Sequence, residues 1–352
     1  EHDSTGEFLY LVAEYYRYTG DRALAERLWP RIASAVTYLD SLRQLRRTPE
    51  YQTADARRFY GLLPPSISHE GYSAKPMHSY WDDTFILRGL RDATELAGVL
   101  CANDARSADC ATRDRFAKIR DGFERDFRES VRLTMERHHI DYVPGSVELG
   151  DFDATSTTTM INPGNEDSGP LGSAIANTFE RYWREFAARR DGTKAWDAYT
   201  PYEWRTVGSF VRRGQIDRAH AAIDWFFSHS RPAGWNHWAE VVFPDPKTPR
   251  FIGDMPHTWV GSDFIRSMLD LLVLDRGRLY GDQGILEIAP GLPEEWLRAG
   301  VTVRNLQTPY GPLSYAIREE DGRIVARVER SQTHDTMFAK PIDTLEYVES
   351  IP

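Results

Sequence analysis

The 352-residue sequence predicts a mainly helical protein that ends in a small antiparallel β domain. Two observations support this fold class. Apolar residues recur at helical spacing, usually in paired segments, through about the first 275 residues. From about residue 278 the apolar period falls to two, which is typical of half-buried strands. We therefore expect a helical domain over 1–277 and a small β-sandwich over 278–352.

The first two helices show the helical pattern clearly. The segment 7–18 is a predicted helix that ends before Gly20, since glycine is favoured just after a helix C-terminus. Pro30 suits the first turn of a second helix, in which Ile32 and Val36 recur at helical spacing. Further helices are predicted over 79–100, 112–137, 172–190, 201–213, 216–230 and 257–275.

Three long loops, 47–78, 138–170 and 231–256, interrupt the predicted helices. Loops longer than about 12–15 residues inside a compact domain are usually functional. We therefore expect the loops to gather on one face of the helical scaffold and to carry the site. In the C-terminal region, Asp321-Gly322 lies between two alternating runs, which is a strong hairpin signal.

Composition and motifs exclude several classes of function. A net charge of −10 argues against nucleic acid or an anionic membrane surface as a partner, because both favour basic patches. No apolar run approaches the ~20 residues of a membrane span. Dinucleotide-binding, P-loop, zinc-protease and nucleophile-elbow motifs are absent from the sequence, and no metal-ligand spacing is found. We therefore expect neither a cofactor nor a metal.

Helix pairs followed by a β-sandwich indicate an α/α toroid, and several short motifs resemble the six-hairpin glycosidases that share this scaffold. The segment 284–329 resembles the C-terminal β domain of bacterial α-L-rhamnosidase-like members. The segments 235–241 and 253–269 resemble the last catalytic loop and helical hairpin of the same proteins. "YWDDTF" at 80–85 is similar to a "WD" segment of trehalase-like and glucosidase-like members. "GDFDATSTT" at 150–158 resembles the loop that carries their general acid.

The resemblance implies an inverting, exo-acting glycoside hydrolase that cleaves an oligosaccharide or polysaccharide. Such enzymes use two carboxyl groups, one protonated as general acid and one ionised as general base for water. The toroid has about twelve barrel helices, whereas the sequence predicts about eight or nine. We therefore expect an upstream segment of the same protein, before Glu1, to complete the barrel.

Glu240 and Asp153 are the predicted catalytic pair. Glu240 lies beside Trp235, His237 and Trp238, whose rings can stack on sugars and raise a carboxyl pKa by desolvation. The resemblance makes Glu240 the base, and the alternative is a glutamate that is ion-paired at a loop edge. Loop length and the weak motif resemblance favour Asp153 as the acid, although an aspartate before threonine and serine also caps helices.

The loop before the third helix, together with the first turn of that helix, is predicted to bind the substrate. It is rich in polar and aromatic side chains that contact sugars: His69, Glu70, Tyr80, Trp81, Asp82 and Asp83. Ser79 and Asp82 fit a capping box, which would give Asp82 a structural role. The resemblance instead makes Asp82 a sugar ligand, and both roles are compatible. The negative charge of Asp83 would be stabilised by the helix dipole, but Asp83 has no capping role.

Three further substrate contacts are predicted in the second half of the chain: Glu203, Trp238 and His257. Glu203 follows Pro201 at a helix N-terminus, where it binds sugar hydroxyls, replaces Asp153 as acid, or only complements the helix dipole. His257 lies at the rim of the expected site, a position where loop histidines are more often structural than catalytic.

Two alternative functions remain open at this level. Toroids also host polysaccharide lyases and sugar epimerases, which use histidine and tyrosine instead of two carboxylates. The residues His69, Tyr72, His78 and Tyr80 keep that alternative open. The second alternative is a carbohydrate-binding toroid without catalysis.

Cys101 and Cys110 flank a polar loop between two predicted helices. They either form a disulfide, which implies an oxidising compartment, or remain unrelated thiols. The resemblance and this cysteine pair predict a secreted or periplasmic protein.

Overall fold

The computed structural model of the chain describes residues 1–67, 74–101, 108–245, 247, 252–275, 285–329, 335–338 and 342–351. The structure is mostly helical (55%) with a C-terminal mixed sheet of four strands. The mainly helical fold with a C-terminal β region is therefore confirmed. The chain divides into two compact units, Glu1–Arg184 and Glu185–Pro352, and the division falls within a helix rather than where the apolar period changes.

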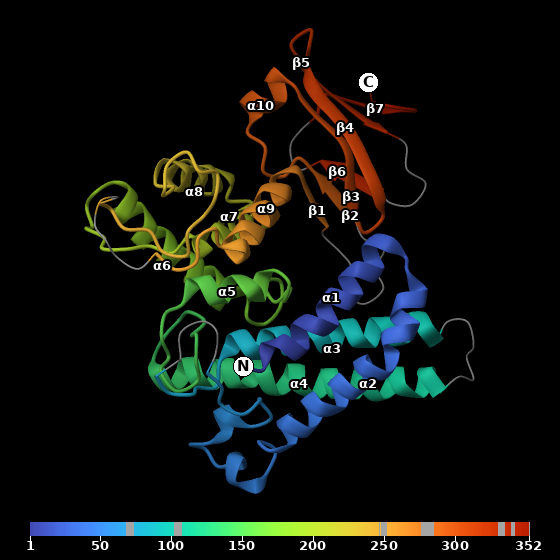
Figure 1. Cartoon of the computed structure of the whole chain (residues 1–352), viewed down its shortest axis with the longest axis vertical. Helices are drawn as coiled ribbons and strands as arrows, with labels where there is room; N and C mark the ends of the chain where they lie inside the picture. The colour runs from blue at the N-terminus through green and yellow to red at the C-terminus, as the bar shows by residue number, and fades with distance from the viewer. Residues whose placement is uncertain are drawn as a thin grey trace. The chain divides into compact units, whose positions relative to one another are not determined.

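The first unit is built from long helices that lie alongside one another (Figure 1). They are α1 (Asp3–Thr19), α2 (Arg22–Gln44), α3 (Tyr80–Cys101), α4 (Ala108–His138), α5 (Ala154–Ile161) and the first part of α6 (Gly172–Arg190), with short 3-10 helices η1 (Pro49–Gln52) and η2 (Arg57–Phe59). Both α1 and α4 pack on α3, and α2 packs on α1 and α3.

Helix α3 is the centre of the first unit. Of its 22 residues, 18 are buried, so it has no polar face of the kind that a surface helix turns to solvent. Its polar residues therefore enter the core, where each needs a partner from a neighbouring helix. Asp92 finds partners in Arg17 of α1 and in Arg88 one turn earlier on α3.

Two glycines allow α1 to approach α3 closely. A Cβ atom at Gly6 would overlap the backbone carbonyl of Phe85, and one at Gly89 would lie 2.8 Å from the Cα of Gly6. Neither position therefore accommodates a side chain without a backbone shift. The close contact brings the N-terminal end of α1 beside the N-terminal end of α3.

The helix ends follow local signals, with one correction. Helix α1 ends at Thr19, and Gly20 adopts the left-handed conformation with φ of 66°, as predicted. Helix α2 begins at Arg22 rather than near Pro30, because Asp21 caps it by accepting a hydrogen bond from Leu24 N at 2.9 Å. Pro30 lies inside the helix, where its ring removes one backbone donor.

Cys101 and Cys110 form a disulfide, with Cα atoms 4.9 Å apart. The bond joins the last residue of α3 to the third residue of α4. The two cysteines are therefore not unrelated thiols.

The second unit begins within α6 and contains five further helices. They are η3 (Pro201–Glu203), α7 (Trp204–Arg212), α8 (Ile216–Ser228), α9 (Thr258–Leu272) and α10 (Glu294–Ala299). Helix α7 packs against α8 and α9. Its first residue, Trp204, is fully buried and contacts Phe226 and Phe264, so aromatic rings form the core between these helices.

The strands form two sheets. One has the order β1 (Val273–Asp275), β2 (Ile285–Ile288), β6 (Asp335–Phe338), and the other has the order β3 (Val301–Thr308), β4 (Gly311–Glu320), β5 (Arg323–Glu329), β7 (Thr344–Val348). The predicted hairpin is confirmed: β4 and β5 pair antiparallel around Asp321 and Gly322, which both have positive φ.

The expectation of purely antiparallel pairing is wrong. Strand β6 runs parallel to β2, and β7 runs parallel to β5. Parallel neighbours need a crossover connection. Strand β6, which belongs to the other sheet, provides the crossover between β5 and β7.

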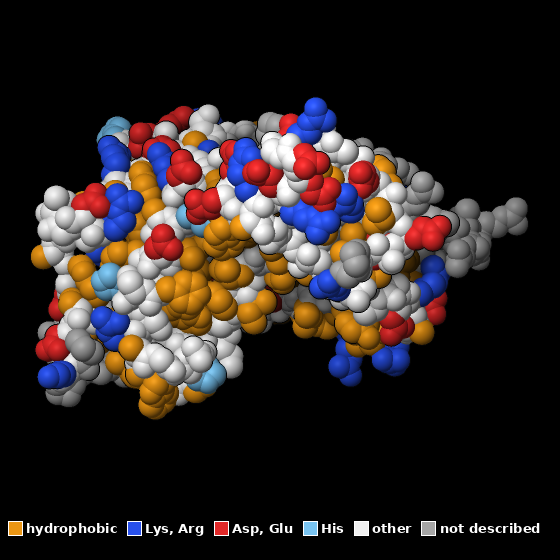
Figure 2. All heavy atoms as spheres, turned by 90° about the horizontal axis from the view of Figure 1, so that it is seen from above, with side chains coloured by type: hydrophobic (Ala, Val, Ile, Leu, Met, Phe, Trp, Pro, Cys, Tyr) orange, Lys and Arg blue, Asp and Glu red, His pale blue; other side chains and the backbone are white. Residues whose placement is uncertain are grey.

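The described helices include none that is long and apolar enough to cross a bilayer. On the face drawn in Figure 2, acidic and basic side chains are interspersed, and hydrophobic side chains gather in patches between them. Trp235, at 63% exposure, is one of the large hydrophobic side chains that reach the surface.

The glycine contact predicts an asymmetric response to alanine. Gly6→Ala should lower the free energy of unfolding by about 1–3 kcal/mol, because the added methyl group overlaps the α3 backbone. Gly98→Ala on α3 is the matched control: its Cβ would meet only the Arg113 side chain at 3.9 Å. Helix propensity should then raise stability by up to about 1 kcal/mol. Urea denaturation measures both, and equal effects of the two substitutions would contradict the close packing.

Candidate active site

The predicted site residues fall in both compact units, and each unit is described separately. The first unit holds Tyr80, Trp81, Asp82, Asp83 and Asp153. The second unit holds Glu203, Trp238, Glu240 and His257. His69 and Glu70, with the neighbouring Tyr72, lie outside the described residues.

Asp82 is a buried carboxyl group in the first turn of α3, with 3% of its surface exposed. Its Oδ2 accepts hydrogen bonds from Ser66 Oγ at 2.5 Å and from the backbone N of His2 at 3.3 Å. Its Oδ1 has no hydrogen-bond partner in the part of the chain that the structure describes. The carboxyl group thus turns towards Ser66 and α1 rather than back to Ser79, so the expected capping box is not formed.

The surroundings of Asp82 favour its protonated form. Burial raises its pKa to about 6, because the charged form loses its hydration. The hydrogen bond from Ser66 opposes this shift, and the nearby charge of Asp3 adds to it. A carboxyl group that keeps its proton up to about pH 6 and has an unpartnered oxygen is suited to donate a proton.

Asp83 has a structural role that the sequence did not indicate. It is 1% exposed, and its Oδ1 accepts a hydrogen bond from the backbone N of Leu63 at 3.3 Å. Burial raises its pKa well above the usual range, and the bond from Leu63 only partly opposes this. Asp83 therefore ties the loop after η2 to α3 through this hydrogen bond.

The two aromatic residues beside Asp82 have complete structural roles. The Trp81 indole donates from Nε1 to Asp3 Oδ2 at 2.9 Å. The Tyr80 hydroxyl is hydrogen-bonded to Ser130 and Thr134, each at 2.8 Å. Both rings lie in the core at 2% exposure or less. They thus connect α3 to α1 and α4, and their contact with substrate stays a prediction.

A second polar chain lies at the same end of α3. Arg46 Nε donates to His78 Nε2 at 3.2 Å, so the His78 proton is on Nδ1 and is donated to Glu148 Oε1 at 2.7 Å. Glu148 also accepts from the backbone N of His78 at 3.0 Å. Partial burial raises the pKa of Glu148, but the hydrogen bonds from His78 outweigh it and the pKa is lowered overall. Sequence reasoning missed Arg46, although it lies in a run rich in arginine.

Asp153 is the N-cap of α5. Its Oδ1 accepts from Ser156 N at 3.0 Å and Thr155 Oγ1 at 2.9 Å, and its Oδ2 accepts from Ser156 Oγ at 2.5 Å. Both oxygens thus accept hydrogen bonds within the cap, which supports the structural alternative for Asp153. Its role as general acid stays a prediction.

In the second unit, Glu240 lies in the segment 231–257, which we call the Glu240 loop. Its backbone carbonyl accepts from Thr200 Oγ1 at 2.9 Å. Its half-buried carboxylate lies against Gly253, where a Cβ atom would overlap it. Gly253 has a φ of 70°, a further reason for glycine here. Among the described residues the carboxylate has no hydrogen-bond or ion-pair partner, so the alternative of an ion-paired glutamate is not supported.

Tyr202 and His257 form a pair beside the Glu240 loop. The Tyr202 hydroxyl and His257 Nε2 are 2.6 Å apart, and His257 Nδ1 lies 4.0 Å from the exposed Asp254 carboxylate. The backbone N of His257 donates to Trp238 O at 2.9 Å, which ties this pair to the loop. Sequence reasoning missed Tyr202, and its only signal is that it directly precedes the candidate Glu203.

Glu203 and Trp238 have structural partners in the fold, and their contact with substrate stays a prediction. The two Glu203 oxygens accept from Arg189 at 2.9 and 2.6 Å in a bidentate pair, and only 8% of Glu203 is exposed. Trp238 is also 8% exposed, and its ring packs against Trp204. The aromatic ring that this loop presents to solvent is that of Trp235.

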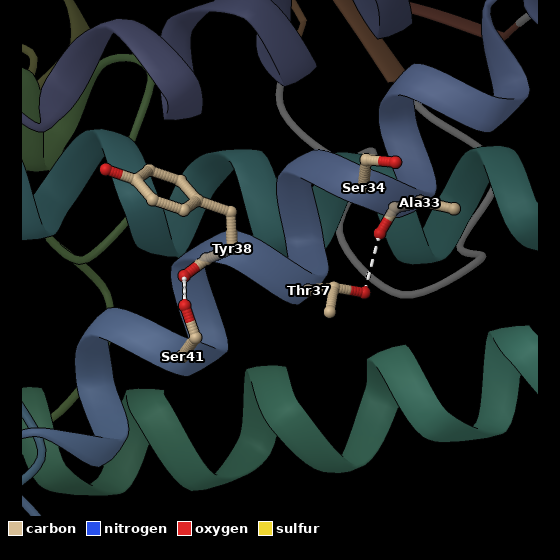
Figure 3. A pocket seen from close by; sticks show the side chains of 5 residues that line it. All are labelled: Ala33, Ser34, Thr37, Tyr38 and Ser41. Atoms are coloured by element: carbon tan, nitrogen blue, oxygen red, sulfur yellow. Dashed lines mark hydrogen bonds between the residues drawn. The ribbon is translucent and has the colours of Figure 1, made fainter.

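A surface hollow of about 440 Å³ on α2 is not a candidate active site. It is lined by Ala33, Ser34, Thr37, Tyr38 and Ser41 (Figure 3). The hydroxyls of its serines and threonine donate to carbonyls of the same helix at 2.6–2.8 Å. Their hydrogens are therefore used, and the lining holds no charged side chain.

No protein-family model matches the sequence, and a search of curated proteins finds no match. Within the described ranges, no group of three or more histidine, cysteine or acidic side chains is placed to hold a metal ion. The candidate site is therefore defined by its geometry alone.

The burial of Asp82 predicts a pH-dependent effect of Asp82→Asn. Since the folded-state pKa is raised from 3.8 to about 6, folded protein holds a proton that the unfolded chain has released. Stability therefore falls as the pH rises from about 4 to about 6. Asparagine keeps an acceptor for Ser66 and His2 without a charge. At pH 8 the free energy of unfolding of the variant should exceed that of wild type by on the order of 3 kcal/mol at most. At pH 3 the two should not differ in this way.

Chemical denaturation at both pH values measures this difference. Asp153→Asn is the control, because asparagine caps helices as well as aspartate does. A lower stability of Asp82→Asn at pH 8 would show that the ionised Asp82 carboxylate stabilises the fold and would contradict the assigned pKa shift.

Proposed function

We propose that the chain is a glycoside hydrolase. In the first unit the candidate general acid is Asp82, in place of Asp153, and in the second unit Glu240 stays the candidate for the general base that the sequence predicts. The observation that carries the proposal is the buried Asp82 carboxyl group, with its raised pKa and an oxygen that has no hydrogen-bond partner among the described residues. The motif resemblance supports the same class and, with it, an α/α toroid bearing a C-terminal β-sandwich. The Cys101–Cys110 disulfide supports a secreted or periplasmic location.

Each role rests on the residue's own surroundings. Hydrolysis with inversion needs a protonated carboxyl group for the leaving oxygen and an ionised one that takes a proton from water. Asp82 holds its proton up to about pH 6. The Glu240 carboxylate has no partner among the described residues, so its lone pairs are available to water. Trp235 offers an exposed ring for sugar stacking.

The proposal requires that substrate reaches the buried Asp82 carboxyl group in the first unit. Because Asp82 is 3% exposed, substrate has to displace a neighbouring group to reach its oxygens. The two neighbours that donate to Oδ2 are the Ser66 hydroxyl and the His2 backbone N. A sugar hydroxyl is able to replace either donor, since it also carries an O–H group that donates to a carboxyl oxygen.

Kinetics on two kinds of substrate separate an acid from a sugar ligand. Asp82→Asn should slow hydrolysis of unactivated oligosaccharides by about 10²–10⁴-fold, because departure of the sugar oxygen needs a proton. The same variant should hydrolyse aryl glycosides with good leaving groups far better, and should lose the pH dependence near 6. Glu240→Gln should be slow on both substrates.

Asp153→Asn is the control for these measurements. If Asp153 only caps α5, this substitution should leave kcat unchanged on both kinds of substrate. Equal losses of Asp82→Asn on both substrates would make Asp82 a ligand rather than an acid. Full activity of Glu240→Gln would exclude Glu240 as the base.

The Tyr202–His257 pair favours one second candidate, a polysaccharide lyase. A base–hydroxyl pair 2.6 Å apart is suited to remove the proton beside a uronate carboxyl group and to return a proton to the leaving sugar oxygen. No water is consumed, and the product carries a carbon–carbon double bond that absorbs ultraviolet light. An absorbing product with wild type, lost in Tyr202→Phe and retained in Glu240→Gln, would establish the lyase. Reducing sugar without that absorbance would exclude it.

A further inference from the structure

The segment 43–60 is basic within an acidic protein. It runs from the last turn of α2 through η1 and η2 and contains five arginines and two carboxylates, a net charge of +3, whereas the whole chain carries −10. We call it the arginine segment. A local reversal of charge of this size needs a structural or a functional reason.

Four of these arginines stack on aromatic rings of the same segment. The guanidinium-to-ring distances are 5.2 Å for Arg46 on Tyr51, 4.9 Å for Arg47 on Tyr60, 4.3 Å for Arg57 on Tyr60 and 4.5 Å for Arg58 on Phe59. Significant cation–π pairs occur about once per 70–80 residues, so this density is high. Stacking occupies the face of a guanidinium, so its N–H edge stays available for an anion.

Two of the stacked arginines make no hydrogen bond or ion pair to a carboxylate among the described residues, although the charge of Arg57 helps to lower the pKa of Glu129. The Arg46 guanidinium bonds only to neutral acceptors, His78 Nε2 and Leu45 O. The Arg57 guanidinium has no hydrogen bond or ion pair within the described part of the chain. In contrast, Arg47 is neutralised by Asp126. Internal ion pairing therefore explains only part of the arginine segment.

The arginine segment adjoins the candidate acid. His78 receives the Arg46 hydrogen bond and lies four residues before Asp82. The His78 ring also lies 4.8 Å from the Phe59 ring, so residues near both ends of the segment contact His78, two residues before α3 begins. An anion bound by Arg46 would thus lie at the same end of α3 as the Asp82 carboxyl group.

We propose that Arg46 and Arg57 bind the carboxylate or sulfate group of an acidic saccharide. Guanidinium edges match both oxyanions, and charge-assisted bonds of this kind are the strong ones. As a statement about substrate, this inference rests on the proposed hydrolase function, whereas the binding itself does not require catalysis. Nucleic acid fits less well, because guanidinium groups cover Tyr51 and Tyr60 and the net charge of −10 repels a long polyanion.

Binding measurements with the full chain carrying Glu240→Gln test the proposal without turnover. The probes are oligogalacturonate for carboxylate, dextran sulfate for sulfate, and dextran as the neutral control, each titrated by calorimetry at low salt. At least one acidic probe should bind, and dextran should not. Arg46→Gln and Arg57→Gln should each weaken that binding by about tenfold or more, since each loses charged hydrogen bonds. Arg46→Lys keeps the positive charge but loses the paired N–H groups of the guanidinium. Its affinity for the acidic probe should therefore lie between those of the protein with Arg46 and of Arg46→Gln.

The control variant is Arg298→Gln, which removes the same charge from an exposed arginine on α10 that is paired with Glu294 and Glu319. It should leave binding unchanged. Equal weakening by Arg298→Gln, equal binding of dextran, or binding of neither acidic probe would overturn the proposal. Tighter binding of single-stranded DNA than of both acidic probes, lost in Arg46→Gln, would assign the segment to nucleic acid and also overturn it.

The outcomes separate this inference from the proposed function. Arg46-dependent binding of an acidic saccharide without turnover of any saccharide by wild type would retain the inference and reject the hydrolase. Turnover of neutral glycosides that depends on Glu240, with no Arg46-dependent binding, would retain the hydrolase and reject the inference.

Discussion

The burial of helix α3 on all its sides is the constraint on which the first unit depends. Helix α1 reaches α3 because two facing glycines leave room for its backbone, and α4 packs on α3 as well. A helix enclosed in this way takes polar groups into the core, and each then needs a partner. Asp92 meets this need with two arginines, and Asp83 meets it with a backbone donor. Among the described residues, Asp82 meets it with only one of its two oxygens.

That incomplete pairing is the physical reason to place chemistry at Asp82. A buried carboxyl group with an unused oxygen lowers stability, and folds retain such groups mainly where function requires them. The neighbouring Arg46 is a second group with unused hydrogen-bonding capacity, and both lie at the same end of α3. In the second unit, Glu240 has the complementary property, a half-buried carboxylate without a partner among the described residues. Asp82, Arg46 and Glu240 therefore keep hydrogen-bonding groups that the described contacts of the fold do not use.

The helices were largely predictable from the sequence because their signals are local. The segment 172–190 was predicted to the residue, since apolar spacing marks its whole length, whereas Pro30 misplaced the start of α2 because the cap at Asp21 was overlooked. The site was less predictable because its contacts span long sequence distances. Ser66 lies 16 residues from Asp82, and nothing in "YWDDTF" tells which carboxyl group meets it. The parallel pairing of β7 was equally hidden, since it depends on where β6 pairs.

The central claim, that Asp82 keeps its proton up to about pH 6, is open to direct measurement. Carbon-13 labelling of the aspartate carboxyl groups allows each to be titrated by NMR, and the Asp82→Asn variant identifies the Asp82 resonance by its loss. The account predicts that this resonance titrates with a pKa of about 6. A resonance that titrates near 4, as an ordinary aspartate does, would contradict it.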